Sequence, residues 1–279
     1  MSVISIETRK ANELAATSNI GDSSIFMVHD GTGLKRITFE DVKRAMVYPN
    51  AGSHNSIYRG KYLGNSVSSA HYTAIRNGTF EDLFIGDYWT IGNINYRIAA
   101  FDYFFNTGDI NCTTHHVVIV PDKCLYTARM NDTDTTQGGY AGSKMYRTEL
   151  NRAKTMVKNA FNNNILKHRL FLSTAIANNE ISNGAWFDSE VNLMNEQMVY
   201  GGAIHMFTSS PTINPPNYRV SKSQLPLFSY NPHLISIREA WFMRDIISDG
   251  GYITIHDPGN SSIGAASSIL GVRPYFCIA

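Results

Sequence analysis

Short β-rich runs and one amphipathic segment set the first part of the chain apart from the rest. The expected elements there are a strand at 24–29, a glycine-bearing turn at 30–33, a strand at 34–37 and a helix at 39–46. Thr38 precedes the helix and Asp41 follows at its third position, the arrangement of a capping box. We therefore expect a small N-terminal unit at residues 1–47, too small to bury a core without a partner.

The middle of the chain alternates apolar strands with helical repeats. A composition break predicts a linker with one short helix at 48–82, where Gly78 ends the helix. Gly92-Asn93 between two β-rich runs is a strong hairpin signal. The other expected elements are strands at 83–91, 94–101, 115–121 and 168–174, and helices at 143–162 and 188–200, the latter capped by Asp188 or Ser189.

The C-terminal third begins with a proline-rich stretch at 208–232, which we expect to be one long irregular loop. After it, polar Tyr252, Thr254 and His256 alternate with Ile253 and Ile255. This alternation, with a turn at Pro258-Gly259, predicts a hairpin at about 249–264 with one face on the core. An apolar closing strand follows at 271–279. The sum is an α+β fold, with a head domain at 83–279.

Charge and composition restrict the partners. The 279 residues include 24 Lys and Arg against 23 Asp and Glu, and only 17% of residues are charged. Binding phosphates requires concentrated cations, so nucleic acid is not an expected partner. No window approaches the roughly 18 apolar residues of a membrane span, and no basic leader starts the chain. We expect synthesis in the cytoplasm and no membrane insertion. A surface rich in Tyr, Asn and Ser is typical of recognition.

Few residues suggest chemistry. His115-His116 could ligate a metal, but neighbouring strand residues point to opposite faces, so we expect packing roles. The 131–134 segment begins like a calcium loop, yet Gln137 and Ser143 replace the glycine and glutamate that an EF-hand requires. Cys112, Cys124 and Cys277 are expected to be buried free thiols. No hydrolase, zinc-protease or phosphate-loop motif occurs. We expect no bound metal, no cofactor and no catalytic residue.

Several ordered motifs carry a resemblance. They are Gly86-Asp-Tyr-Trp-Thr, Asn95-Tyr-Arg-Ile-Ala99, His115-His-Val-Val-Ile-Val-Pro121, Gly138-Gly-Tyr-Ala-Gly-Ser-Lys-Met-Tyr146, Leu193-Met-Asn-Glu-Gln-Met-Val-Tyr-Gly201, Gln224-Leu-Pro-Leu-Phe228, Trp241-Phe-Met-Arg-Asp245 and Gly271-Val-Arg-Pro-Tyr-Phe276. Together they resemble a family from phages and prophages of gut Firmicutes, whose domains resemble the C-type-lectin fold of phage receptor-binding proteins such as the major tropism determinant. Residues 1–80 resemble the N-terminal region of phage tail-fibre proteins.

The resemblance implies a virion protein that the N-terminal unit attaches to other virion proteins. It also implies a homotrimer whose C-type-lectin-like head binds a host cell-surface receptor, either glycan or protein, without catalysis. Two alternatives stay open: a purely structural capsid-fibre or baseplate protein, and an enzyme that modifies the cell envelope. Formylglycine-generating enzymes share this lectin-like core but rely on paired cysteines, which Cys112 and Cys124 would have to provide.

Receptor contacts are best sought where the fold-defining motifs stop. Trp241 and Arg273 lie inside those motifs, so we expect the first to be core and the second a structural hydrogen-bond donor. In the tropism determinants that this chain resembles, receptor-facing residues fall in the C-terminal region. The candidate receptor-binding residues are Tyr218, Arg219, Arg244, Tyr252, Thr254, His256, Asp257 and Asn260.

Overall fold

The computed structural model describes residues 20–21, 23–178, 180–202, 204 and 223–279, and the chain divides into two compact units, 1–48 and 49–279. In the N-terminal unit, β1 (Ile25–His29) pairs with β2 (Leu34–Thr38), and α1 (Phe39–Met46) follows directly. The Thr38 hydroxyl accepts from the Asp41 backbone N–H at 3.1 Å, which confirms the predicted capping box. None of the described side chains in this unit is buried.

Residues 49–82, expected to be a linker with one short helix, contain that helix but are part of the larger unit. They form α2 (Ala51–Asn55) and α3 (Ser69–Arg76), which place His54, Tyr72 and Ile75 in the interior. His54 Nδ1 lies 2.6 Å from the Leu83 carbonyl oxygen, and the Tyr72 hydroxyl donates to the Phe161 carbonyl at 3.0 Å. The polar composition of this segment suggested a linker, but the few apolar residues of the segment pack against the core.

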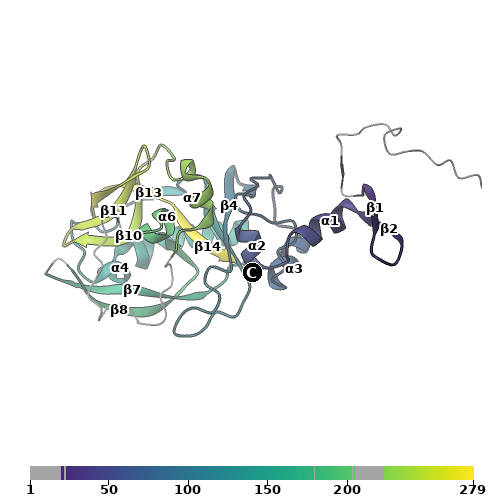
Figure 1. Ribbon diagram of the computed structural model, residues 1–279. Coiled ribbons are helices and arrows are strands. Elements are labelled where there is room, and N and C mark those ends of the chain that lie inside the picture. Colours follow the sequence, from purple (N-terminus) through teal and green to yellow (C-terminus); the bar gives the residue numbers. More distant parts are fainter. Residues whose placement is uncertain (1–19, 22, 179, 203, 205–222) are drawn as a thin grey trace, which may run out of the picture. The chain divides into compact units, whose positions relative to one another are not determined.

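One antiparallel sheet has the order β3-β4-β5-β14-β9. Figure 1 labels two of its strands, β4 and β14. Its strands are β3 (Tyr88–Ile91), β4 (Ile94–Phe101), β5 (Val117–Pro121), β14 (Pro274–Ile278) and β9 (Val191–Leu193). Gly92 and Asn93 both have positive φ, as the predicted tight hairpin turn requires. Every residue of β5, β14 and β9 is buried, so the last strand of the chain lies in the interior between strands from two earlier segments.

The second sheet has the order β12-β11-β10-β13-β6. Its strands are β12 (Asn260–Ala265), β11 (Gly251–His256), β10 (Trp241–Ser248), β13 (Leu270–Val272) and β6 (Tyr126–Ala128). A long separate hairpin pairs β7 (His168–Ala177) with β8 (Glu180–Ser189). The α+β class is therefore confirmed, and so is the predicted C-terminal hairpin, which is β11–β12.

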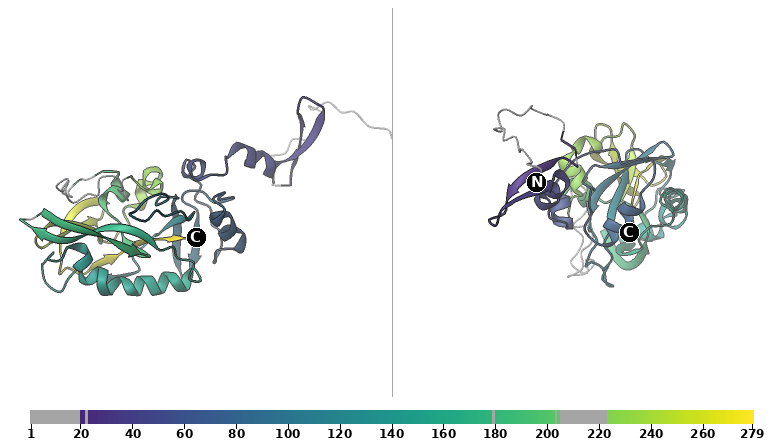
Figure 2. Two further views of the ribbon diagram at one scale, coloured as in Figure 1. Left: turned by 90° about the horizontal axis from the view of Figure 1, so that it is seen from below. Right: turned by 90° about the vertical axis from the view of Figure 1, so that its right-hand side faces the viewer.

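The helices of the larger unit differ from the prediction in two places. The expected helix at 143–162 consists of a π-helical turn, η2 (Met145–Glu149), continued by α5 (Leu150–Ala160), seen as the long teal helix in the left view of Figure 2. The expected helix at 188–200 is wrong in its first half, because β8 runs to Ser189 and β9 follows. Only α6 (Glu196–Tyr200) is helical, capped by Asn195. The strand prevails over the helical pattern because β9 is buried against β14.

The proline-rich stretch at 208–232 is not wholly irregular. Residues 205–222 lie outside the described residues, but α7 (Pro226–Tyr230) lies within the stretch and η3 (Pro232–Leu234) begins at its last proline. Earlier in the chain, α4 (Gly139–Gly142) precedes η2. Pro226 begins α7, a position where the missing proline N–H costs no hydrogen bond.

Arg273 and Trp241 are both fully buried, as expected. Arg273 Nε donates to the Pro121 carbonyl at 2.9 Å and Nη1 to the Leu234 carbonyl at 2.8 Å. The guanidinium carbon lies 5.2 Å from the ring centroid of Trp241 and 5.6 Å from that of Phe228. Burial lowers the pKa of Arg273 to about 10, so the charge remains at neutral pH. Arg273 is a structural donor that joins three segments.

A substitution at Gly139 tests whether α4 lies as close to β7 as the structure shows. Its φ is +64°, and an added Cβ would lie 2.4 Å from the Ser173 backbone oxygen. We expect Gly139→Ala to lower the free energy of unfolding by about 1–3 kcal/mol, because backbone strain and overpacking act together. Gly202→Ala is the matched control, since none of the described residues has an atom within 4 Å of its Cβ position. Thermal unfolding measures both, and equal melting temperatures for the two variants would contradict the packing described.

Candidate functional site

The turn of the β11–β12 hairpin presents polar groups to solvent. His256 and Asn260 face each other across the end of the ladder, and Asp257 begins the turn. All three side chains are exposed. The turn occurs at Pro258-Gly259 as predicted, with Gly259 in the left-handed region at φ +106°.

Other segments hold this turn in place. The Tyr200 hydroxyl, at the end of α6, donates to the Gly259 carbonyl at 2.8 Å. Ser236 Oγ donates to Asp257 Oδ1 at 2.8 Å. Ser261 follows Asn260 in the chain, and its Oγ donates to Glu196 Oε1 at 2.6 Å. A turn tied to separate segments keeps its exposed side chains in a defined arrangement, which lowers the entropic cost of binding a partner.

The exposed groups are chemically mixed. His256 Nε2 lies 3.1 Å from Thr254 Oγ1, and the second carboxylate oxygen of Asp257 has no hydrogen-bond donor among the described residues. The Asn260 amide has no hydrogen-bond partner in the described part of the chain. An imidazole, a carboxylate and an amide can together donate and accept, which suits recognition of a polar surface.

Two candidates from the same strand are wrong. Tyr252 and Thr254 are fully buried, so neither can contact a receptor. The Tyr252 hydroxyl points toward α4 and donates to the Gly139 carbonyl at 3.5 Å. Alternation along β11 suggested one exposed face, but β11 lies between β10 and β12 and both of its faces are covered.

Arg244 is also wrong as a candidate receptor contact, because only 8% of its surface is exposed. Its Nη1 donates to the Leu193 carbonyl at 3.3 Å, and its charge helps to lower the pKa of the buried His168 to about 3, after the larger effect of burial itself. Tyr218 and Arg219 lie outside the described residues. The structure thus brings together His256, Asp257 and Asn260.

Two carboxylates lie beneath the hairpin. Glu196 is fully buried, and besides Ser261 it accepts from the Ile204 backbone N–H at 2.9 Å. Asp245 Oδ2 accepts from the Glu196 backbone N–H at 2.6 Å. Burial raises the pKa of Asp245 to about 6, and the charge of Glu196 adds to this effect. The pair anchors the start of α6 to β10.

The suspected metal motifs have structural partners. His115 Nδ1 lies 2.7 Å from Asp102 Oδ2, while the buried His116 accepts at Nε2 from the Phe104 N–H at 3.1 Å. In the suspected calcium loop, Asn131 Oδ1 accepts from the Lys144 N–H. Asp132 pairs with the Lys144 side chain, and Asp134 accepts from the Ser267 N–H. Among the described residues, no group of three or more His, Cys, Asp or Glu could hold a metal ion.

The three cysteines are free, but only Cys277 is buried; Cys112 and Cys124 are partly exposed, contrary to expectation. Burial nevertheless raises the pKa of all three thiols. A thiol with a raised pKa is a poor nucleophile at neutral pH. These thiols therefore lack the activation that cysteine chemistry requires.

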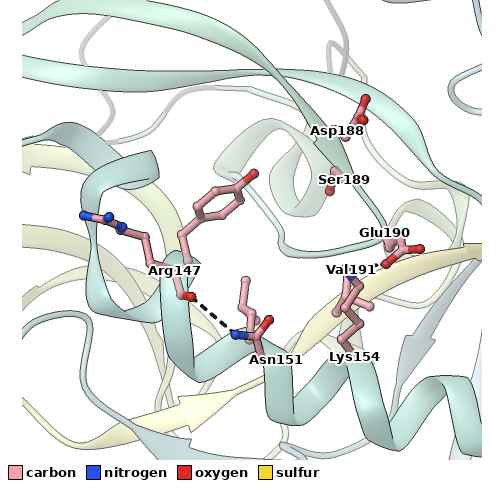
Figure 3. A pocket seen from close by; sticks show the side chains of 9 residues that line it. Arg147, Asn151, Lys154, Asp188, Ser189, Glu190 and Val191 are labelled. Carbon is pink, nitrogen blue, oxygen red and sulfur yellow. Dashed lines mark hydrogen bonds and ion pairs between the residues drawn. The ribbon is translucent and has the colours of Figure 1, made fainter.

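Sequence reasoning missed a pocket of about 230 Å³ on another part of the head (Figure 3). One wall is helical, with Tyr146, Leu150, Asn151 and Lys154, and the other is the chain at 188–191. The second wall carries the carboxylates of Asp188 and Glu190. The position of these two carboxylates relative to the helical wall depends on where β8 ends. The sequence pattern predicted a helix at 188–200 and therefore did not show that β8 continues to Ser189.

Comparison with protein-family models, with curated proteins and with solved structures found no match to this chain. None of the helices in the described part of the chain has the length and apolar character needed to cross a bilayer.

The raised pKa of Asp245 predicts how the stability of the protein changes with pH. Between about pH 4 and 6 the folded protein keeps a proton on Asp245 that the unfolded chain, with a pKa near 3.8, has released. The stability of the wild type relative to Asp245→Asn should therefore fall as pH rises across this window, by up to about 2–3 kcal/mol. Urea unfolding of both proteins at several pH values measures the difference. A difference that does not vary with pH would contradict the raised pKa.

Proposed function

We propose that the chain is a phage virion protein, a tail-fibre or receptor-binding adhesin whose head recognises a host cell-surface receptor without catalysis. The observation that carries this proposal is the exposed turn of His256, Asp257 and Asn260, anchored by Tyr200 and Ser236. A rigid frame that presents mixed polar groups is suited to recognition, and the sequence motifs are the source of the virion assignment.

The N-terminal unit supports an attachment or oligomerisation role. Its register places Ile25, Met27 and Leu34 on the same face of the β1–β2 hairpin, and these residues are 58%, 61% and 66% exposed. The opposite face carries Phe26, whose ring lies 5.9 Å from that of Phe39 in α1. A unit with no buried side chain among its described residues gains stability from covering such a face. The proposed partners are other virion proteins and two further copies of the chain.

A C-type-lectin-like head is part of the same proposal. It is supported by the motifs at 115–121 and 271–276, far apart in sequence, which form the neighbouring strands β5 and β14. Motifs that define a family are often those that pack together in its core.

The competing enzyme hypothesis has one observation in its favour, the neighbouring Glu196 and Asp245 with the raised pKa of Asp245. Perturbed carboxylates occur at active sites, but also in structural networks. Glu196 is fully buried and both of its carboxylate oxygens accept hydrogen bonds, which favours the structural role. The purely structural virion protein differs from the adhesin only in having no receptor.

Deletion of residues 1–48 should leave a folded head that no longer enters virions. The larger unit contains all of the buried core of the described chain, so its thermal transition should persist. Incorporation is measured by probing purified particles for the truncated protein beside full-length chain. Particles that contain the truncated chain at the wild-type level would contradict the attachment role.

Replacement of His256, Asp257 and Asn260 together by Ala should reduce adsorption of particles to host cells by about tenfold or more, since clustered contacts dominate interfaces. The matched control replaces Asn65 and Ser66, exposed polar residues of the same unit, by Ala. Both variants should fold and enter particles as the wild type does, because none of the replaced side chains is buried.

Unchanged adsorption by the hairpin variant would place recognition elsewhere or support a purely structural protein. Release of soluble fragments from purified host envelope by the isolated chain would instead favour the enzyme.

A further inference from the structure

The pocket of about 230 Å³ described above lies where η2 and α5 face the junction between β8 and β9. Figure 3 shows Asn151 and Lys154 on the helical side and Asp188 and Glu190 across from them. The Arg147 side chain extends away from that opposite wall, so it contributes its backbone rather than its charge. This region shares no residue with the β11–β12 hairpin.

The shape of the helical wall depends on the π-helical turn. A π-turn widens the helix locally, and such turns are frequent at functional sites. Tyr146 lies in this turn, and its ring is positioned by Tyr140 at 5.4 Å and by Phe187 at 5.8 Å between centroids. With the buried Leu150, it provides the apolar part of the lining.

The charged groups across the pocket are held by ion pairs. Glu190 pairs with Lys154 and, at 3.0 Å, with Lys158. Asp188 pairs with Lys167 at 3.1 Å and with Arg169 at 3.0 Å. Each carboxylate is thus oriented before any ligand arrives, a condition for selective hydrogen bonding.

The pairing also restricts the ligand's charge. An anion entering the pocket would approach the carboxylates of Asp188 and Glu190, whereas a cation would approach Lys154. Either charge would have to compete with an ion pair that already exists. A neutral ligand can accept from the ammonium group and donate to the carboxylates without breaking these pairs.

Asn151 adds a group that donates and accepts. Its Nδ2 donates to the Arg147 carbonyl at 3.3 Å, which leaves the second amide hydrogen and Oδ1 without a partner in the described part of the chain. An amide in this state matches two adjacent hydroxyl groups, one as acceptor and one as donor. It lies at the exposed rim, where a ligand can reach it.

We propose that this pocket binds one neutral sugar residue. A pyranose ring has an apolar C–H face, which would lie on Tyr146 and Leu150, and a rim of hydroxyl groups for Asn151, Asp188 and Glu190. The volume corresponds to roughly eight waters at about 30 Å³ each, room for a single ring. The inference goes beyond the proposed adhesin function, because it names a ligand class at a second surface.

The test is saturation-transfer NMR on the full-length chain with the methyl glycosides of glucose, galactose, N-acetylglucosamine and rhamnose. Glucuronic acid and glucosamine serve as the anionic and cationic probes. We expect saturation transfer to at least one neutral glycoside at roughly millimolar affinity. The dissociation constant should rise about tenfold or more in Asn151→Leu, and also in Glu190→Gln.

Asn65→Leu is the matched control, because it makes the same change at another exposed position. It should bind the glycoside as the wild type does, and so should the variant of His256, Asp257 and Asn260, which separates this pocket from the hairpin. Circular dichroism confirms that each variant is folded. The proposal is overturned if no neutral glycoside gives a signal, if a charged probe binds more tightly, or if both pocket variants bind as the wild type does.

Discussion

The larger unit depends on the insertion of β14 between β5 and β9. All five residues of this strand are buried, and its partners come from segments more than 150 and about 80 residues earlier in the chain. Until the C-terminus is in place, β5 and β9 have unpaired backbone groups that would be costly to bury. Arg273, directly before this strand, bonds to the carbonyls of Pro121 and Leu234.

Burying a guanidinium without a carboxylate is costly unless other groups replace its hydration. Here two carbonyl oxygens and the faces of Trp241 and Phe228 do so. Arginine is better suited to this role than lysine because its planar, weakly hydrated group can donate in the plane and stack above it. Arg273 thereby joins β14 to the second sheet, because Trp241 belongs to β10 of that sheet.

The burial of these strands explains why few of the candidate receptor-binding residues are exposed. The hairpin turn is fixed by Tyr200 and Ser236, and the strand β11 is buried, so the proposed receptor contacts on this hairpin are confined to the turn itself. The pocket proposed to bind a sugar depends on the same strand pairing, since β9 is held by β14 and thereby sets the position of Asp188 and Glu190 opposite α5. The N-terminal unit differs, because several of its apolar residues are exposed and none of those described is buried.

The sequence by itself determined the elements whose signals are local. These include the Thr38 capping box, the Gly92-Asn93 hairpin, the helix around 150–160 and the Pro258-Gly259 turn, because backbone conformation there depends on neighbouring residues. It also indicated that Trp241 would be core and Arg273 a structural donor. Tertiary structure decided the rest. The segment 188–193 is strand rather than helix because β14 pairs with it, and Tyr252 and Thr254 are buried because β11 is covered on both faces. Such pairings join residues distant in sequence, and the free energy of burial they provide exceeds local preference.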